Sequence, residues 1–269
     1  MSTGAAARGD ALLANMIQHY QSDPVGNANL RPNTHVFNTV INCWSKSKDR
    51  DAASKAEEIF LAMEKLHDNG VPGLKPDAFT YTVLIDAWAK TGMRGAASRA
   101  EALLTQMENK FLAGDTELKP NSFTYNAVLN SLAKSGEPGA ANKAERVLHN
   151  MVNRHKAGEI NDVKPTTIHF NALLDAFAKS GGGRDAAERA EHILEWMDGL
   201  FKSGNADVKP DTITFNAVLD CWARSGDHRR AAERAEQILN HMDRLHTLGN
   251  TGIKADSYTY NTGKSVHSS

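Results

Sequence analysis

The chain has 269 residues, with 31 Lys plus Arg against 32 Asp plus Glu and a formal net charge of −1. Proteins that bind nucleic acid are often basic, so this balance argues against RNA binding unless cations gather on one face. The two cysteines exclude a disulfide framework. No apolar run approaches the roughly 18 residues that a membrane span requires, and we expect no membrane association.

One block of sequence recurs along the whole chain. It begins at six positions that lie 44, 44, 45, 45 and 45 residues apart: Thr34, Ala78, Ser122, Thr167, Thr212 and Ser257. A fixed period of this kind identifies a repeat array in which each unit packs mainly against its neighbours. Each start residue is position 1 of its repeat, and the residue before the next start is the last position.

The two ends of the chain match parts of a repeat. Residues 6–16 read AARGDALLANM and align with residues 97–107, ASRAEALLTQM. We therefore expect the chain to open inside the second helix of a repeat and to stop about one turn into another, after Asn261. Repeat arrays normally end in atypical polar caps, so the ends predict a fragment of a longer protein. No targeting peptide is visible at the N-terminus.

Each complete repeat predicts two helices. Before the first helix stands Pro and then Asp, Asn or Thr, which are good N-caps. Apolar residues follow at positions 4, 7, 8 and 11, on one helical face, and a Gly ends the helix. The second helix opens with paired alanines and runs to a Met, and a loop of about a dozen residues follows. The methionines at these expected helix ends are Met63, Met107, Met151, Met197 and Met242.

No strand pattern competes with this helical spacing, so the predicted fold is all-α: a right-handed α-solenoid of stacked helix-turn-helix repeats. We expect a partial repeat over 1–33, complete repeats over 34–77, 78–121, 122–166, 167–211 and 212–256, and the truncated start of a sixth over 257–269.

Positions 2, 5, 9 and 13 of the first helix form a second face, which stacking would place along an inner groove. Position 5, the amide row, is Asn38, Thr82, Asn126, Asn171 and Asn216, with Asn261 in the truncated repeat. The last position, the cap row, is Asp77, Asn121, Thr166, Asp211 and Asp256. Amides can read base edges because they donate and accept hydrogen bonds. Two other roles remain open here: a hydrogen bond between repeats for the amide row, and N-capping for the cap row.

Two further columns flank these rows. Position 2, the clamp column, is His35, Phe79, Phe123, Ile168, Ile213 and Tyr258. Bulky residues of this kind could sandwich a base or pack between adjacent helices. Position 13, the cation row, is Lys46, Lys90, Lys134, Lys179 and Arg224. These cations could each meet a phosphate or stabilise a helix C-terminus.

No catalytic or metal site emerges. Asp86, Asp175 and Asp220 recur once per repeat at position 9, so they are stacked a repeat apart and do not converge. The histidines have no ligand spacing, and no phosphate loop, nucleophile elbow or zinc signature is present. We expect no enzyme activity, no cofactor and no metal.

These motifs resemble the pentatricopeptide repeat, as in FTYNAVLNSLAKSG at 123–136 and ITFNAVLDCWARSG at 213–226, over about residues 5–261. The units are longer than the family's usual one, and we place the extra residues between the two helices and in the loop after the Met. The tetratricopeptide pattern W-x2-L-G-x2-Y is absent.

The resemblance implies sequence-specific binding of single-stranded RNA, one base per repeat, in mitochondrial or plastid RNA processing, stability or translation. The amide and cap rows would select the base, the clamp column would sandwich it, and the cation row would meet the backbone. Carried over repeat by repeat, the pairs imply U for Asn38 with Asp77, A for Thr82 with Asn121, a weak pyrimidine preference for Asn126 with Thr166, and U for the last two pairs. The implied site is 5′-U-A-(C/U)-U-U-3′.

We expect a monomer whose partners are single-stranded RNA and other RNA-processing proteins. Two alternatives come from other classes. One is a helical scaffold that binds a peptide in the groove. The other is the RNA-binding arm of an enzyme that resembles protein-only ribonuclease P, whose nuclease domain has no counterpart in this sequence.

Overall fold

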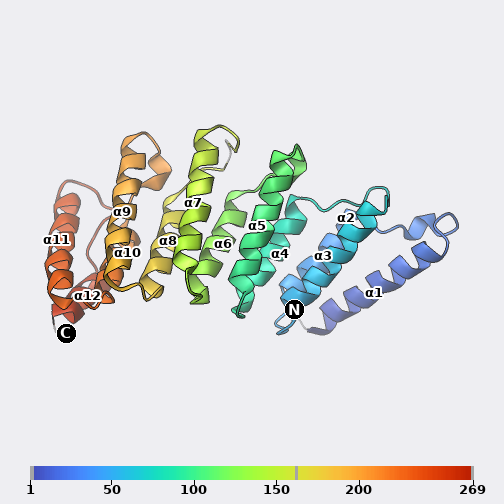
Figure 1. Ribbon diagram of the computed structural model, residues 1–269, viewed down its shortest axis with the longest axis horizontal. Coiled ribbons are helices and arrows are strands. Elements are labelled where there is room, and N and C mark those ends of the chain that lie inside the picture. The colour runs from blue at the N-terminus through green and yellow to red at the C-terminus, as the bar shows by residue number, and fades with distance from the viewer. Residues whose placement is uncertain (1–2, 161–162, 268–269) are drawn as a thin grey trace. The chain divides into compact units, whose positions relative to one another are not determined.

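The computed structural model describes residues 3–160 and 163–267, and within these ranges it contains helices and no strand (Figure 1). Residues 1–2, 161–162 and 268–269, which fall in three of the expected repeat segments, lie outside the described part. The α-helices are α1 Thr3–Ser22, α2 Thr34–Ser45, α3 Ala52–Asp68, α4 Ala78–Thr91, α5 Ala96–Leu112, α6 Ser122–Ser135, α7 Ala140–Lys156, α8 Thr167–Lys179, α9 Gly183–Lys202, α10 Thr212–Ala223, α11 His228–Thr247 and α12 Ser257–His267. Three short 3-10 helices, η1 Ala28–Leu30, η2 Thr116–Leu118 and η3 Ala206–Val208, lie in the loops.

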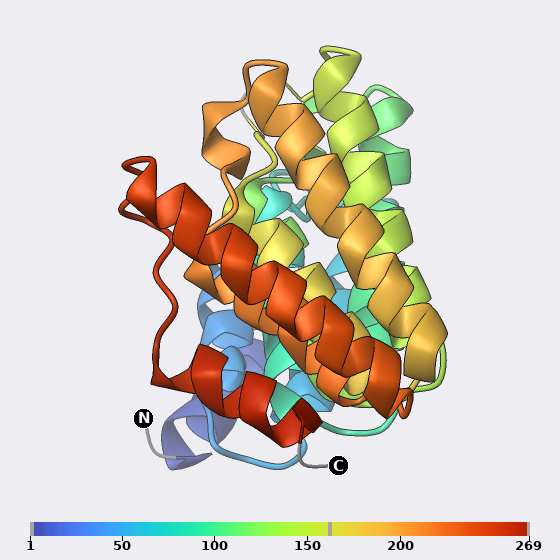
Figure 2. The ribbon, with the colours of Figure 1, turned by 90° about the vertical axis from the view of Figure 1, so that its left-hand side faces the viewer.

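The chain divides into two compact units, Met1–Ser131 and Leu132–Ser269. In the first unit α2 packs against α1, α3 and α4, and α4 packs against α3 and α5. In the second unit α8 packs against α7, α9 and α10, and α10 also contacts α9, α11 and α12. Figure 2 shows α11 and α12 beside each other at the C-terminal end of this unit. Each unit is therefore a stack of helix pairs, and the all-α repeat fold is confirmed.

Local chemistry explains where the first helices begin and end. The carboxylate of Asp77 accepts a hydrogen bond from the backbone N–H of Thr80 at 2.8 Å, and Asp211 does the same for Thr214 at 2.9 Å. These bonds satisfy N–H groups that have no partner within the helix. At the other end, Gly92 caps α4 with φ of 60°, a left-handed conformation that glycine adopts without a steric penalty.

The cores of the units lie where the periodicity places them. The aromatic residue at position 4 is at most 2% exposed in each complete repeat: Phe37, Tyr81, Tyr125, Phe170 and Phe215. The central alanines and the methionine of each second helix are equally buried, for example Ala100 and Met107 at 0%. Small residues on one side and large ones on the other let the two helices of a pair approach closely and fill the space between them.

The second helices are longer than the sequence pattern suggested, and the loops are correspondingly shorter. α3 continues five residues past Met63 to Asp68, and α5 continues five past Met107 to Leu112. These added residues include Glu, Lys and Leu, which favour helix, and the first breaker is the glycine at Gly70 or Gly114. The second helices therefore end about five residues later than expected, and only that part of the expected loop is α-helical. The C-terminal segment also stays helical, because α12 reaches His267.

Arginine–glutamate pairs connect successive second helices within each unit. Arg99 of α5 binds Glu57 of α3, and Arg234 of α11 binds Glu191 of α9. Arg189 of α9 lies 2.5 Å from Glu145 of α7 in the same way. These pairs repeat at one register and therefore fix how one repeat is set against the next.

The two cysteines differ in accessibility, although both stand at position 10. Cys221 is 2% exposed, and burial raises the pKa of its thiol to about 12, whereas Cys43 is only half-buried. The thiolate is the reactive species. We therefore expect an aromatic disulfide reagent at pH 8 to label Cys43 and to spare Cys221 until the protein is unfolded, which mass spectrometry of the two peptides would measure. Equal labelling rates in the native protein would contradict the packing of α10.

Candidate nucleic-acid interface

In the first unit, the amide and cap rows meet across successive repeats. The Asn38 amide nitrogen donates to the Asp77 carboxylate, with distances of 3.2 and 3.3 Å to its two oxygens. The Asn38 carbonyl accepts from the hydroxyl of Thr80 at 2.6 Å. In the Thr82–Asn121 pair, the hydroxyls of Thr82 and Thr124 share a hydrogen bond of 3.0 Å. The Thr124 hydroxyl also donates to the side-chain oxygen of Asn121. The two rows therefore lie close enough for one base to contact both members of a pair.

The second unit repeats this arrangement. The Asn171 amide donates to Asp211 at 3.2 Å and accepts from the Thr214 hydroxyl at 2.7 Å. Asn216 accepts from Thr259 at 2.8 Å, and the backbone N–H of Thr259 donates to Asp256 and lowers the pKa of that carboxyl below its ordinary value. The Asp256 carboxylate is thus held ionised beside the Asn216 amide. Ionised carboxylates accept hydrogen bonds and do not donate them.

Asn126 and Thr166 belong to different units. Within its own unit Asn126 accepts a hydrogen bond of 3.1 Å from the amide of Asn130, one turn along the same helix.

In two of the pairs, the hydrogen bonds leave specific groups for a ligand. In the Asn171–Asp211 pair, one amide N–H and the second carboxylate oxygen are not used by the bonds described above. A donor beside an acceptor matches a base edge on which a carbonyl stands beside a ring N–H, as in uracil and guanine. For Thr82 with Asn121, the amide oxygen serves the helix cap, so the remaining amide N–H groups can only donate.

The threonine at position 3 is a functional residue that our sequence reasoning missed. It is fully buried at Thr80, Thr124, Thr214 and Thr259, and the other two repeats have Val36 and His169 in its place. Its hydroxyl contacts both the amide and the cap residue of the preceding repeat, so the hydrogen bond between repeats and the capping role both occur. The signal was present as Asp or Asn followed three residues later by Thr, a capping-box spacing.

Removing the Asn171 amide should therefore weaken the fold as well as any ligand contact. We expect Asn171→Ala to lower the free energy of unfolding by about 1 kcal/mol, because the partly buried bonds to Asp211 and Thr214 are lost. Urea titration would measure this. Asn240→Ala, at an exposed site on α11, is the control and should stay within about 0.5 kcal/mol of the wild type. Equal small effects would mean that the amide does not link the repeats.

The clamp column is exposed. Phe79 is 51% exposed, Phe123 56%, Ile168 and Ile213 64% each and Tyr258 50%, and His35 is exposed as well. Residues of this size that only packed between adjacent helices would be covered. The exposed residues recur once per repeat and stand beside polar rows, which is the arrangement expected of a surface that stacks against flat rings.

The cations of position 13 are all exposed, but their local electrostatics differ. Lys90 pairs with Asp86, Lys179 lies 2.7 Å from Asp175, and Arg224 lies 4.0 Å from Asp220. In the other two repeats, position 9 is Asn42 or Asn130, so Lys46 and Lys134 have no carboxylate one turn before them. We call Asp86, Asp175 and Asp220 the shield, since each offsets a cation of the row.

Other kinds of site receive no support from the described residues. Over residues 3–160 and 163–267, no cluster of His, Cys, Asp and Glu has the geometry to hold a metal ion. None of the helices described is long and apolar enough to span a membrane.

Comparison with known proteins adds independent information. The family described as "Pentatricopeptide repeat domain" matches residues 66–135 and 114–180. Among solved structures, the crystal structure of the pentatricopeptide repeat protein PPR10 from maize has 20% sequence identity and a TM-score of 0.38, over 94% of this chain and 33% of the maize chain. This chain thus spans about a third of that protein, and the likeness is too distant to carry an argument. No curated protein matches.

The matched segment overlaps four of the repeats, and the same sequence block and helix pair recur on both sides of it. Residues 66–180 therefore match the pentatricopeptide repeat family, and the block that they carry recurs along the rest of the chain.

Proposed function

We propose that the protein binds single-stranded RNA along the face formed by positions 2, 5, 9 and 13 and the cap row, without catalysing a reaction. The observation that carries this proposal is the coincidence, in each unit, of exposed apolar side chains with paired polar groups, of which the Asn171–Asp211 pair keeps a free donor and a free acceptor. The cations of position 13 lie about two turns beyond the amides and about three turns beyond the clamp residues, at or near the C-terminal ends of the same helices.

Each pair then recognises one base. The Asn38–Asp77, Asn171–Asp211 and Asn216–Asp256 pairs would donate to a base carbonyl and accept from its ring N–H, which suits uracil. The Thr82–Asn121 pair would donate to an acceptor on adenine. The first unit therefore reads U-A and the second reads U-U, with the 5′ base of each pair at the repeat nearer the protein's N-terminus. By family, we propose that the targets are organellar transcripts in mitochondria or plastids.

The amides also separate RNA binding from peptide binding. With Asn171→Ala and Asn216→Ala combined, we expect a several-fold loss of affinity for an oligoribonucleotide that carries the implied site, measured by fluorescence anisotropy at a salt concentration where the variant remains folded. The loss should depend on the two bases opposite these residues. An unchanged RNA affinity would favour a scaffold whose groove binds protein.

A further inference from the structure

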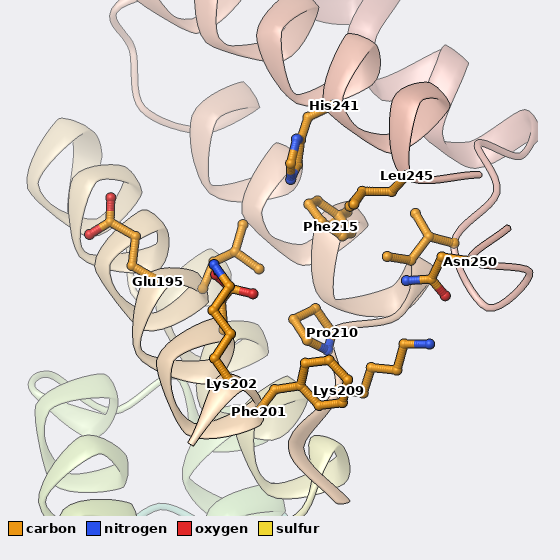
Figure 3. A pocket seen from close by; sticks show the side chains of 12 residues that line it. Glu195, Phe201, Lys202, Lys209, Pro210, Phe215, His241, Leu245 and Asn250 are labelled. Carbon is orange, nitrogen blue, oxygen red and sulfur yellow. The ribbon is translucent and has the colours of Figure 1, made fainter. Parts of the chain in front are cut away.

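A pocket of about 360 Å³ opens in the second unit, on the side of the second helices (Figure 3). α9 supplies Leu194 and Phe201, α11 supplies His241 and Leu245, and the start of α10 supplies Phe215. None of the amide, cap, clamp or cation residues lines it. Its size and mainly apolar walls are those of small-molecule sites.

In the first unit, the corresponding space is closed by polar side chains. There Glu64 of α3 accepts from Tyr81 at 3.3 Å, from Gln106 at 3.1 Å and from Lys110 at 2.7 Å. Between α7 and α9 the space is closed differently, because His149 stacks on Trp196 with ring centroids 4.2 Å apart.

The equivalent residues between α9 and α11 cannot close the gap. Asp198 replaces the glutamate and pairs with Lys202 on its own helix, Phe215 lacks the tyrosine hydroxyl, and Leu245 lacks the lysine amine. His241 also stands where Gln106 does, so four register positions differ between the two places, and a change in one side chain does not account for the pocket.

Among the residues described, two polar groups at the rim of the pocket lack a hydrogen-bond or ion-pair partner. In the first unit Lys75 lies 2.8 Å from Asp115 and 3.3 Å from Glu117. The residues at the same places for Lys209 are Asn250 and Gly252, and no carboxylate pairs with Lys209 among the residues described.

The side-chain oxygen of Asn250 is buried without a hydrogen-bond donor, in the part of the chain described. A buried acceptor in this state is costly unless a ligand or water supplies a donor. Figure 3 shows Lys209 and Asn250 on the same side of the pocket, with Glu195 on the other side and its carboxylate directed away.

We propose that this pocket binds a small planar aromatic anion. The ring lies against Phe201, Phe215 and Leu245, the anionic group meets the Lys209 ammonium, and a donor on the ring satisfies the Asn250 oxygen. The Lys209 ammonium lies 5.9 Å from the centre of the Phe201 ring, so the charge stands at the edge of the apolar wall. The carboxylate of Asp198 opposes an anion only weakly because Lys202 neutralises it.

The test uses two fluorescent probes on the full chain: 1-anilinonaphthalene-8-sulfonate, which is an aromatic anion, and N-phenyl-1-naphthylamine, its neutral counterpart. We expect saturable binding of the sulfonate with one site per chain. Lys209→Gln should weaken it about tenfold, as loss of a hydrogen bond to a charged group implies, and should leave the neutral probe unchanged. The same fall for both probes, or for neither, would overturn the assignment of the cation.

A second variant closes the pocket with side chains that the chain already uses elsewhere. Combining Asp198→Glu, Phe215→Tyr and Leu245→Lys rebuilds the arrangement of Glu64, Tyr81 and Lys110, and we expect it to remove the saturable site for both probes. Alanine at Leu61 and Leu112, which are exposed outside the pocket, should leave that site intact. Wild-type binding by a folded closing variant would overturn the proposal. If thermal melting shows that this variant does not fold, the comparison of both probes on Lys209→Gln decides.

Discussion

Alanine at both Phe79 and Phe123 will lower the affinity for single-stranded RNA about 100-fold and leave the fold nearly unchanged. Stacking of a base on an aromatic side chain is worth about 1–3 kcal/mol, and a 100-fold loss corresponds to about 1.4 kcal/mol for each of the two lost stacks. Both rings are more than half exposed, so their removal should change the free energy of unfolding by no more than about 0.5 kcal/mol each. Anisotropy titration and urea unfolding measure the two quantities on the same samples.

The matched control is Leu61→Ala with Leu112→Ala. These leucines are 52% and 54% exposed but lie on the second helices α3 and α5. We expect wild-type RNA affinity from this pair. A similar loss in both double variants would show that general surface hydrophobicity is responsible and that the clamp column has no specific role.

Neutralising the shield will strengthen RNA binding. The change combines Asp86→Asn, Asp175→Asn and Asp220→Asn, and it frees Lys90, Lys179 and Arg224. An ion pair at this helical spacing is worth about 0.3–0.5 kcal/mol, so releasing three of them should raise the affinity about five- to tenfold. Because a phosphate contact on a single strand contributes about −0.7 to the salt slope, the slope should steepen by up to about 2.

An equal change of charge elsewhere provides the control. Glu58→Gln, Glu188→Gln and Glu233→Gln remove three carboxylates that also form helical ion pairs, but on α3, α9 and α11. If this variant gains as much affinity as the shield variant, net charge alone explains the effect and the pairing at positions 9 and 13 is irrelevant. A shield variant with wild-type affinity and slope would mean that these cations do not meet phosphate.

Much of the fold could be predicted because its signals are local. The Asp77 cap and the terminal Gly92 each depend on the residues beside them, and the buried Tyr81 and Phe215 follow from spacing within one helix. The end of α3 was placed too early for a similar reason: a Met marks the close contact of the helix pair, whereas the helix itself stops only at the breaker Gly70.

The sequence predicted which residues of the candidate site share a row, but not the hydrogen bonds between them. Periodicity grouped Asn38 with its counterparts, but the link from Asn38 through Thr80 to Asp77 joins two repeats and depends on how they are stacked. The pairing of Asp86 with Lys90 could have been predicted, because the four-residue spacing is visible in the sequence. The pocket could not, since it requires residues such as Asp198, Phe215 and Leu245 to be compared at four register positions in three helices.

The central claim is that RNA lies on the face that carries the amide, cap, clamp and cation residues. The most direct test is to titrate the protein with an oligoribonucleotide that contains 5′-UACUU-3′ and with its scrambled form, over a range of salt concentrations. The account predicts tighter binding to the first sequence at every salt concentration and a log–log salt slope no steeper than about −3.5, the limit for five phosphate contacts. Absence of binding to either RNA would contradict the account. Equal affinity for the two sequences would refute the assignment of bases to the amide and cap rows.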